Sequence, residues 1–281
     1  MSKELTVVIP CFNHGEFLHE ALESIIESDP QGICEIIVVN DGSTDDYTLK
    51  VLSEINNESI RIINKENGGL ASARNRGIDE AQCEYILMLD SDNKIKPAFI
   101  HSFLELRAEG RQFDMLHGDA LYFGQKTGIF KSAPLNIFRI FQGNYIDACT
   151  IIKKQTLIEL GKYDGNMPYM GWEDWDLWIR MALHNKQTIY IDKVFFEYRY
   201  LENSMIRTIG HKENETKQFL INKYENHLID DICLNNVLND LITLNIEKMG
   251  IRELLKILHG KIRYKLFKKG NLKHRIFKLW I

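Results

Sequence analysis

The sequence lacks the patterns that mark several common classes of protein. Its five cysteines are scattered and include no C-x-x-C pair, so they predict neither a disulfide framework nor a zinc site. This cysteine usage is typical of a reducing compartment, and we expect a cytoplasmic protein. No leader of the signal-peptide type precedes the first strand-like segment, and no uncharged apolar run approaches the roughly 20 residues of a membrane-spanning helix.

Acidic residues are nearly absent from residues 251–281, which contain ten lysines or arginines and one glutamate, although the chain carries a net charge of −4. Apolar residues recur there at helical spacing. A basic amphipathic helix favours an anionic membrane surface, which would hold the protein peripherally on the inner face of the cell membrane. The alternative is packing against the acidic remainder of the chain or a partner subunit, such as a second copy in a homo-oligomer. No nucleic-acid partner is expected.

Strands and helices alternate over the first hundred residues. Apolar runs at 5–9, 36–39, 60–63 and 85–89 are separated by helical periodicity over 17–28, 45–55 and 70–82, and a further helix follows at 97–109. This rhythm predicts an α/β fold with a mostly parallel central sheet and helices on both faces. We divide the chain into 1–110, a segment 111–210 that completes the sheet and forms the other wall of a cleft, and a helical extension 211–281.

Polar and acidic residues follow each predicted strand, at 10–13, 40–41, 64–69 and 90–92. The carboxyl ends of parallel strands lie along one edge of the sheet, where ligands bind in such folds. Asp90-Ser91-Asp92 offers two carboxylates, the ligands that Mg²⁺ and Mn²⁺ prefer; the alternative is a solvated turn. Asp41 could accept hydrogen bonds from a base or ribose; the alternative is a turn in which Ser43 or Thr44 is expected to cap the next helix, and the two are compatible.

Two further segments carry groups suited to substrate binding. Gly68-Gly69 precedes Arg74-Asn75, which places a helix N-terminus and a cation where a phosphate could bind; the alternative is a solvated arginine. Residues 171–176 interleave tryptophans with acids, which favours a general base in a partly apolar cleft and aromatic rings against sugars. The alternative is a helix N-terminus with core tryptophans.

These motifs, in this order and preceded by the strand 6–13, resemble the family-2 glycosyltransferases of the GT-A fold over about residues 4–207. The resemblance implies a Rossmann-like GT-A domain with a nucleotide-sugar half (1–110) and an acceptor and catalytic-base half (111–210). It implies an inverting, metal-dependent enzyme that moves one sugar from a nucleotide-sugar, with uridine diphosphate expected, to a carbohydrate or lipid-linked glycan acceptor. Bacterial surface polysaccharide or lipopolysaccharide synthesis is the implied setting.

The resemblance also implies roles for individual residues. Asp174 would be the catalytic base, with Glu173 beside it, and Asp92 with Asp90 would bind Mn²⁺ or Mg²⁺. Family members often place another phosphate or metal ligand, sometimes a histidine, after the last strand, but residues 198–205 contain no histidine and the third ligand is unassigned. The remaining implied contacts are with the nucleotide-sugar (Pro10, Phe12, Asn13, Asp41, Arg74, Asn75, Asp90 and Ser91) and with the acceptor or sugar (Trp172 and Trp175).

Other functions remain open from the residues alone. A sugar nucleotidyltransferase would normally carry a glycine-rich, basic loop after the first strand, which residues 11–14 do not form. A non-catalytic nucleotide-sugar-binding relative would be expected to have an incomplete set of acids, and here the set is complete. The absence of G-x-G-x-x-G after the first strand argues against a dehydrogenase. The Q-x-x-R-W pattern of processive family members is absent, which favours the addition of single sugars.

Overall fold

The computed structural model describes residues 3–201, 208 and 210–229. These residues belong to one compact unit, Met1–Cys233. The predicted basic helix over 251–281 lies outside the described residues, and the division of the chain at 110 and 210 stays a prediction. In the part of the chain that the structure describes, no helix has both the length and the apolar composition needed to cross a bilayer.

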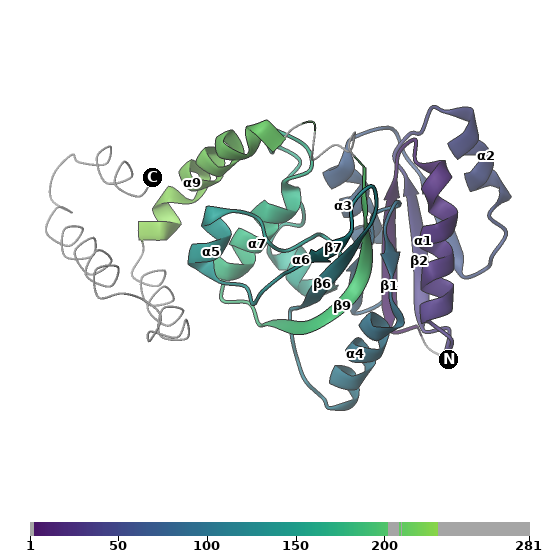
Figure 1. The fold of residues 1–281 in the computed structure, drawn as a ribbon, viewed down its shortest axis with the longest axis horizontal. Helices are drawn as coiled ribbons and strands as arrows, with labels where there is room; N and C mark the ends of the chain where they lie inside the picture. The colour runs from purple at the N-terminus through teal and green to yellow at the C-terminus, as the bar shows by residue number, and fades with distance from the viewer. Residues whose placement is uncertain (1–2, 202–207, 209, 230–281) are drawn as a thin grey trace, which may run out of the picture. The chain divides into compact units, whose positions relative to one another are not determined.

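The first half of the chain forms four parallel strands connected by helices (Figure 1). The strands lie in the order β3-β2-β1-β4, so the chain winds outward from β1 in both directions. This arrangement confirms the predicted strand–helix alternation. The elements are β1 (Leu5–Cys11), α1 (Gly15–Ser28), β2 (Cys34–Asn40), α2 (Asp46–Glu54), β3 (Ile60–Asn64), α3 (Leu70–Glu80) and β4 (Tyr85–Met88).

The second half completes the same sheet with mixed pairing, as the loss of strand–helix alternation predicts. Beyond β4 the order is β8, β6, β9 and β5, with β7 paired to β6, which gives nine strands within the described residues. Only β6 and β9 pair in parallel there. The strands are β5 (Lys94–Ile95), β6 (Met115–Gly124), β7 (Gly128–Phe130), β8 (Ile151–Lys153) and β9 (Thr188–Tyr200); the helices are α4 (Pro97–Ala108), α5 (Ile137–Gln142), α6 (Lys154–Glu159), α7 (Glu173–Leu183) and α9 (Glu213–Ile229), after a short 3₁₀ turn (Gly210–Lys212).

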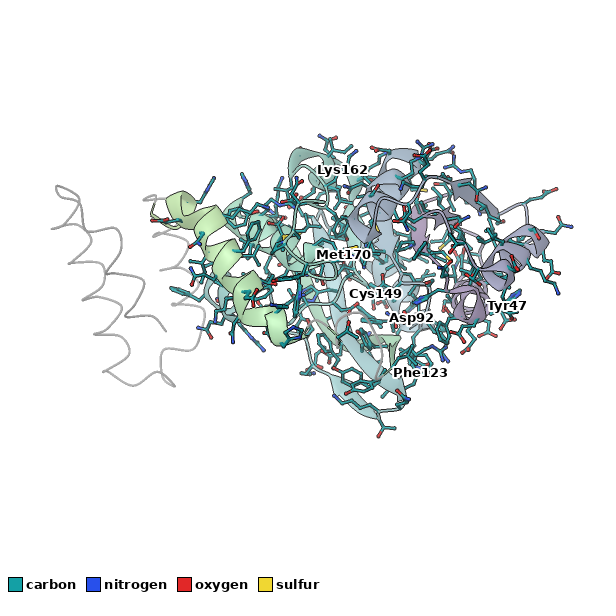
Figure 2. The ribbon with its side chains drawn as sticks, turned by 90° about the horizontal axis from the view of Figure 1, so that it is seen from above. Tyr47, Asp92, Phe123, Cys149, Lys162 and Met170 are labelled. Atoms are coloured by element: carbon teal, nitrogen blue, oxygen red, sulfur yellow. The ribbon has the colours of Figure 1, made fainter. Side chains whose placement is uncertain are left out.

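Helices cover both faces of the sheet, and alternate residues of β1 separate the two cores. Leu5, Val7 and Ile9 pack with α1, α2 and α4 on one face. Val8 points to the other face, where α3, α5, α6, α7 and α9 pack. Side chains fill the space on either side of the sheet (Figure 2). Strands β1, β2 and β4 are therefore buried on both faces, which explains why their sequences are continuous apolar runs.

Helix α3 lies directly on β1 because Gly77 has no side chain. A Cβ atom at this position would lie 2.2 Å from Cγ1 of Val8, closer than any normal contact. The contact fixes the distance between helix and strand. It also places the first turns of α3, which carry Arg74, beside the carboxyl edge of the parallel strands.

Candidate active site

A cavity of about 1230 Å³ opens at the carboxyl edge of the parallel strands. One wall comes from the ends of β1, β2 and β4, at Pro10, Asp41 and residues 90–93. The opposite wall comes from the loop between α5 and β8, around residues 144–148, and from the start of α7 at residues 170–174. The structure thus brings together the strand ends and the tryptophan-rich segment, which are far apart in the sequence.

Asp41 holds the glycine-rich loop that precedes α3. Its carboxylate accepts hydrogen bonds from Gly68 N at 3.1 Å and Gly69 N at 2.8 Å, and it pairs with the Lys65 ammonium. The side chain is only 3% exposed and lines the cavity. Gly69 has φ +83°, a conformation that favours glycine. Asp41 therefore shapes the loop at the nucleotide end of the predicted site.

Arg74 joins the two walls of the cavity. Its guanidinium is buried and forms ion pairs with Asp90 and with Glu173, each at 2.7 Å. The second oxygen of Glu173 accepts a hydrogen bond from Gly171 N at 2.7 Å. Both oxygens of Glu173 are thus engaged, and its role in the structure is to hold Arg74. Nε of Arg74 is buried and has no hydrogen-bond partner within the described residues, so one donor remains beside the cavity.

The segment after β4 is held from both sides. Arg199 donates from its backbone N to Oδ1 of Asn93 at 2.9 Å and from Nε to the carbonyl of Asp92 at 3.0 Å. Ser91 Oγ lies 3.3 Å from Nδ1 of His14. Burial, followed by the negative charge of Asp90, raises the pKa of Asp92 to about 7. A cation bound beside Asp92 would therefore stabilise the ionised form of its carboxylate.

The donor set at this segment fits a divalent cation shared with a substrate. Among the residues that the structure describes, no three His, Cys, Asp or Glu side chains gather as a complete metal site. Asp90 and Asp92 offer two carboxylates, and one oxygen of Asp90 already binds Arg74. Mg²⁺ commonly binds through one or two carboxylates and takes its other ligands from water and substrate phosphates.

Asp174 lies at the start of α7, in the wall opposite the strand ends. Its Oδ2 accepts a hydrogen bond from Nδ2 of Asn144 at 3.0 Å, and its Oδ1 accepts one from Trp175 N at 2.7 Å. The residue is 8% exposed. Burial, followed by the charge of Glu173, raises the pKa of Asp174 to about 8. Its carboxylate therefore has the proton affinity that a general base needs near neutral pH.

Asp147 is a cavity carboxylate that the sequence motifs do not identify. It lies in the loop between α5 and β8, and its Oδ1 accepts a hydrogen bond from Cys149 N at 2.8 Å. Burial, followed by the charge of Asp90, raises the pKa of Asp147 to about 7. The sequence contains one signal for Asp147: it is an acidic residue shortly before the short strand β8 (Ile151–Lys153). The surrounding segment has no periodicity that would indicate a strand or a helix. Asn144, His14 and Tyr198 also line the cavity and were not predicted.

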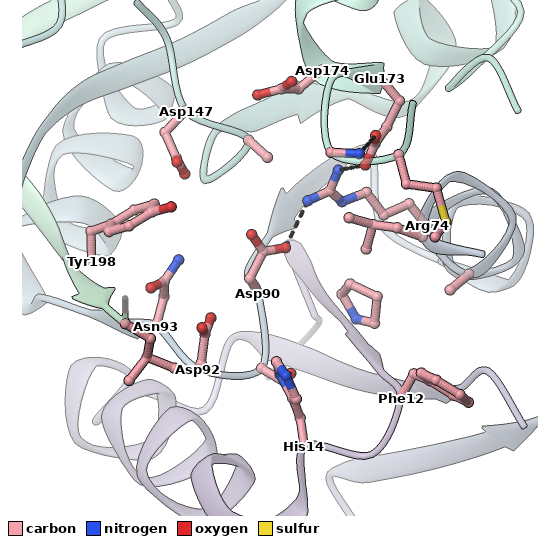
Figure 3. Close-up of a pocket in the computed structure, with 18 of the residues that line it drawn as sticks. Phe12, His14, Arg74, Asp90, Asp92, Asn93, Asp147, Glu173, Asp174 and Tyr198 are labelled. Atoms are coloured by element: carbon pink, nitrogen blue, oxygen red, sulfur yellow. Dashed lines mark hydrogen bonds and ion pairs between the residues drawn. The ribbon is translucent and has the colours of Figure 1, made fainter. Parts of the chain in front are cut away.

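Most of the predicted residues line this one cavity, and Figure 3 shows how several of them face it. Phe12 lines the cavity and is 44% exposed. Trp172 lies on the wall that carries Asp174. The ten predicted residues in the lining are Pro10, Phe12, Asp41, Arg74, Asp90, Ser91, Asp92, Trp172, Glu173 and Asp174.

Three predicted residues do not line the cavity, and their contacts explain why. Oδ1 of Asn13 accepts hydrogen bonds from the backbone of residues 44 and 45, which ties β1 to the start of α2. Asn75 pairs with both backbone groups of Tyr163, at 2.8 and 2.9 Å. Trp175 is fully buried and donates to the Ile140 carbonyl, so its ring has no surface for a sugar.

Acidic groups outnumber basic ones around the cavity. We call Asp90, Asp92, Asp147, Glu173 and Asp174 the acidic cluster; Figure 3 shows these side chains around one space. Among the lining residues that the structure describes, the only basic side chains are Arg74 and His14. Arg74 is paired with two members of the cluster, Asp90 and Glu173. The other three carboxylates ionise at pKa values of about 7 to 8, and above these values their negative charge is left for a ligand to balance.

Comparison with known proteins gives consistent matches. The sequence model of the family described as Glycosyl transferase family 2 matches residues 6–156. Glycosyltransferase GlyA of Streptococcus pneumoniae is 30% identical over 225 residues, which cover 73% of this chain and 32% of GlyA. Glycosyltransferase GlyG of the same organism is 34% identical over 132 residues, 46% of this chain and 43% of GlyG. The chain thus spans less than half the length of these relatives.

Solved structures share the fold. S. aureus TarS 1-349, in complex with UDP-GlcNAc, superposes with a TM-score of 0.63 at 18% sequence identity. The match covers 92% of this chain and 80% of the TarS chain. A second structure of TarS 1-349, in complex with UDP, gives a TM-score of 0.57. At this identity the likeness shows the fold.

Proposed function

Because this chain belongs to glycosyl transferase family 2, we propose that it is an inverting, metal-dependent glycosyltransferase that moves one sugar from a UDP-sugar to a hydroxyl of a carbohydrate or lipid-linked glycan. The observation that carries the proposal is the acidic cluster, which faces a cavity with few basic groups. An anionic diphosphate would be repelled there unless a cation accompanied it. The TarS structure with UDP-GlcNAc supports uridine diphosphate as the nucleotide.

Asp92 and Asp90 would hold Mn²⁺ or Mg²⁺, and the diphosphate would supply further ligands. When bound, the ion would neutralise the charge that builds up on the departing diphosphate. Arg199 supports this arrangement by fixing the backbone of Asp92 at 3.0 Å. Arg74 keeps the carboxylate of Asp90 in place through its 2.7 Å ion pair.

Asp174 is the proposed catalytic base. It would take the proton from the acceptor hydroxyl as the oxygen attacks the anomeric carbon from the face opposite the diphosphate. A single displacement of this kind inverts the anomeric configuration. Asn144, which donates to Oδ2 at 3.0 Å, orients the carboxylate. Glu173 is unsuited to the role because Arg74 and Gly171 engage both of its oxygens.

A nucleotide-sugar screen by thermal shift tests the proposal. Any ligand that binds the folded state alone raises the thermal midpoint; a ligand at a hundred times its dissociation constant adds about 2.7 kcal/mol. We expect UDP and a subset of UDP-sugars to raise the midpoint of the full chain with Mn²⁺, and to lose this effect in EDTA. If ligands from other classes, such as dinucleotides, stabilise the chain and no nucleotide-sugar does, the proposal is wrong.

The raised pKa of Asp174 predicts an unusual pH profile. The protonated carboxyl cannot accept a proton, so the enzyme is inactive below the pKa of the base and active above it. With a pKa of about 8 in the free protein, we expect kcat/KM, which reports the free enzyme, to rise with pH across the neutral range. An ordinary aspartate, with a pKa near 3.9, would give a flat profile there. The rate of UDP release at substrate concentrations well below KM, measured between pH 5.5 and 9, distinguishes the two, and a flat profile contradicts the assignment.

A further inference from the structure

Asp147 has an oxygen that faces the cavity without a partner. Its Oδ1 accepts the hydrogen bond from Cys149 N at 2.8 Å, whereas Oδ2 accepts no hydrogen bond from the residues that the structure describes. The side chain points into the cavity, and the carboxylates of Asp90 and Asp174 are drawn around the same space (Figure 3). A carboxylate held in this way is ready to accept a hydrogen bond from a ligand.

Asp147 lines the same cavity as the proposed metal ligands and the proposed base. Figure 3 shows its carboxylate facing the space around which Asp90, Asp92 and Asp174 also lie. In agreement with this placement, burial raises the pKa of Asp147 and the charges of Asp90 and Asp92 raise it further, while the charge of Asp147 adds to the effect of burial on the pKa of Asp174. In a displacement, the anomeric carbon lies between the leaving diphosphate and the attacking hydroxyl. The sugar being transferred must occupy the same part of the cavity as Asp147.

We propose that Asp147 is a specificity-determining residue, which accepts a hydrogen bond from a hydroxyl or amide N–H of the transferred sugar and restricts the donor to uncharged sugars. The proposal rests on the proposed glycosyltransferase function. An ionised carboxylate is only an acceptor, so it matches the donors on a neutral sugar. A uronic acid would bring another carboxylate toward Asp90, Asp147 and Asp174, and like charges at short range repel strongly in a desolvated site.

The experiment compares sugar-dependent with nucleotide-dependent binding. Calorimetric titration of the full chain with Mn²⁺ uses UDP, UDP-glucose, UDP-galactose, UDP-GlcNAc and UDP-glucuronic acid as probes. For the wild type we expect at least one neutral UDP-sugar to bind ten times or more tightly than UDP-glucuronic acid. Asp147→Asn should lower the affinity for the neutral UDP-sugar that the wild type binds most tightly by about ten- to hundredfold, the usual loss for one hydrogen bond to a charged group. The affinity for UDP should change less than twofold.

Two further variants keep the result interpretable. Glu213→Gln removes one negative charge from the same cavity lining, and we expect it to leave the neutral UDP-sugar affinity unchanged. Asp147→Ser preserves an acceptor for Cys149 N but loses the second carboxylate oxygen, and should behave as Asp147→Asn does. The asparagine variant should also fold well. Burial raises the pKa of Asp147 to about 7, so the ionised side chain lowers the stability of the folded protein at neutral pH, and the neutral asparagine removes this cost.

The outcomes separate this proposal from the proposed function. If Asp147→Asn weakens the binding of UDP and of UDP-sugars equally, or weakens neither, Asp147 does not contact the transferred sugar in the way proposed. The glycosyltransferase function then still stands. If wild-type protein binds UDP-glucuronic acid as tightly as the neutral donors, the restriction to uncharged sugars is wrong. If neither UDP nor any UDP-sugar binds, the proposed donor class fails and this proposal fails with it.

Discussion

Replacement of Asp174 with asparagine is expected to lower kcat by about 10²–10⁴, the usual loss for a general base. Asparagine has the same shape but cannot take the proton of the acceptor hydroxyl. Its Oδ1 can still accept the hydrogen bond that Trp175 N makes at 2.7 Å, so the start of α7 should be preserved. The affinity for UDP-sugar should change less than about threefold. Steady-state UDP release and calorimetry measure the two effects separately.

Glu173→Gln is the matched control for this experiment. Glu173 is buried and pairs with Arg74 at 2.7 Å, and removal of one partner of a buried ion pair costs up to about 3–5 kcal/mol. Its main effect should thus be a lower thermal midpoint. Asp174→Asn should instead raise the midpoint near pH 8, because a carboxyl whose folded pKa exceeds its unfolded pKa loses stability as pH rises between the two values.

Wild-type turnover by Asp174→Asn would contradict the assignment of the base. Asp176 would not be the natural replacement, although it lies in the same acidic run. It is fully buried, and its carboxylate is bound by Arg180, Lys223 and Tyr224. The base would then have to be sought elsewhere in the acidic cluster. Asp147 is the candidate, because no described residue engages its Oδ2 and it is not one of the proposed metal ligands.

Replacement of Asp92 with asparagine is expected to abolish activity through loss of the cation. Loss of a mere hydrogen-bond partner of a metal ligand typically weakens metal binding about 10–100-fold, so loss of one of two carboxylate ligands should weaken Mn²⁺ binding at least a hundredfold. Burial raises the pKa of Asp92 to about 7, so the metal-free variant should be no less stable than the metal-free wild type at pH 8. Calorimetric titration of Mn²⁺ and thermal unfolding in EDTA measure these effects.

Glu213→Gln serves as the control, since it removes a charge from the same lining but from none of the proposed ligands. It should retain the Mn²⁺ affinity of the wild type. Full transfer activity of wild-type protein in excess EDTA would contradict the metal-dependent account, whatever the variants do.

The fold and the edge that carries the site were predictable because local pattern and global architecture agree. Buried parallel strands require apolar runs, and polar residues at their ends have one common edge to occupy. Residues that directly follow a strand, such as Pro10, Asp41 and Asp90, line the cavity for this reason. The pairing of Arg74 with Glu173 could not be predicted, because it joins residues 99 positions apart and depends on how α3 and α7 share one core.

The direction of individual side chains was the weakest part of the prediction. Trp172 directly precedes α7 and Trp175 lies in its first turn, and their rings contact each other at a centroid distance of 5.5 Å, so sequence position alone does not show which of them reaches the cavity. Trp172 lines the cavity and Trp175 enters the core. Asn13 and Asn75 belong to the family motif, yet both amides hold backbone segments together. Asp147 was missed because it lies in the loop between α5 and β8, where no periodicity in the sequence indicates which way a side chain points.

The central claim, sugar transfer with inversion from a UDP-sugar, is tested most directly by proton NMR of the reaction itself. The full chain would be incubated with Mg²⁺, which avoids strong paramagnetic broadening, together with the UDP-α-sugar that stabilises it most and a panel of simple sugar acceptors. We expect the anomeric signal of the donor to decline, UDP to accumulate, and a new anomeric signal of β configuration to appear. A product that retains the α configuration would contradict inversion, and formation of UTP and sugar 1-phosphate from added pyrophosphate would identify a nucleotidyltransferase instead.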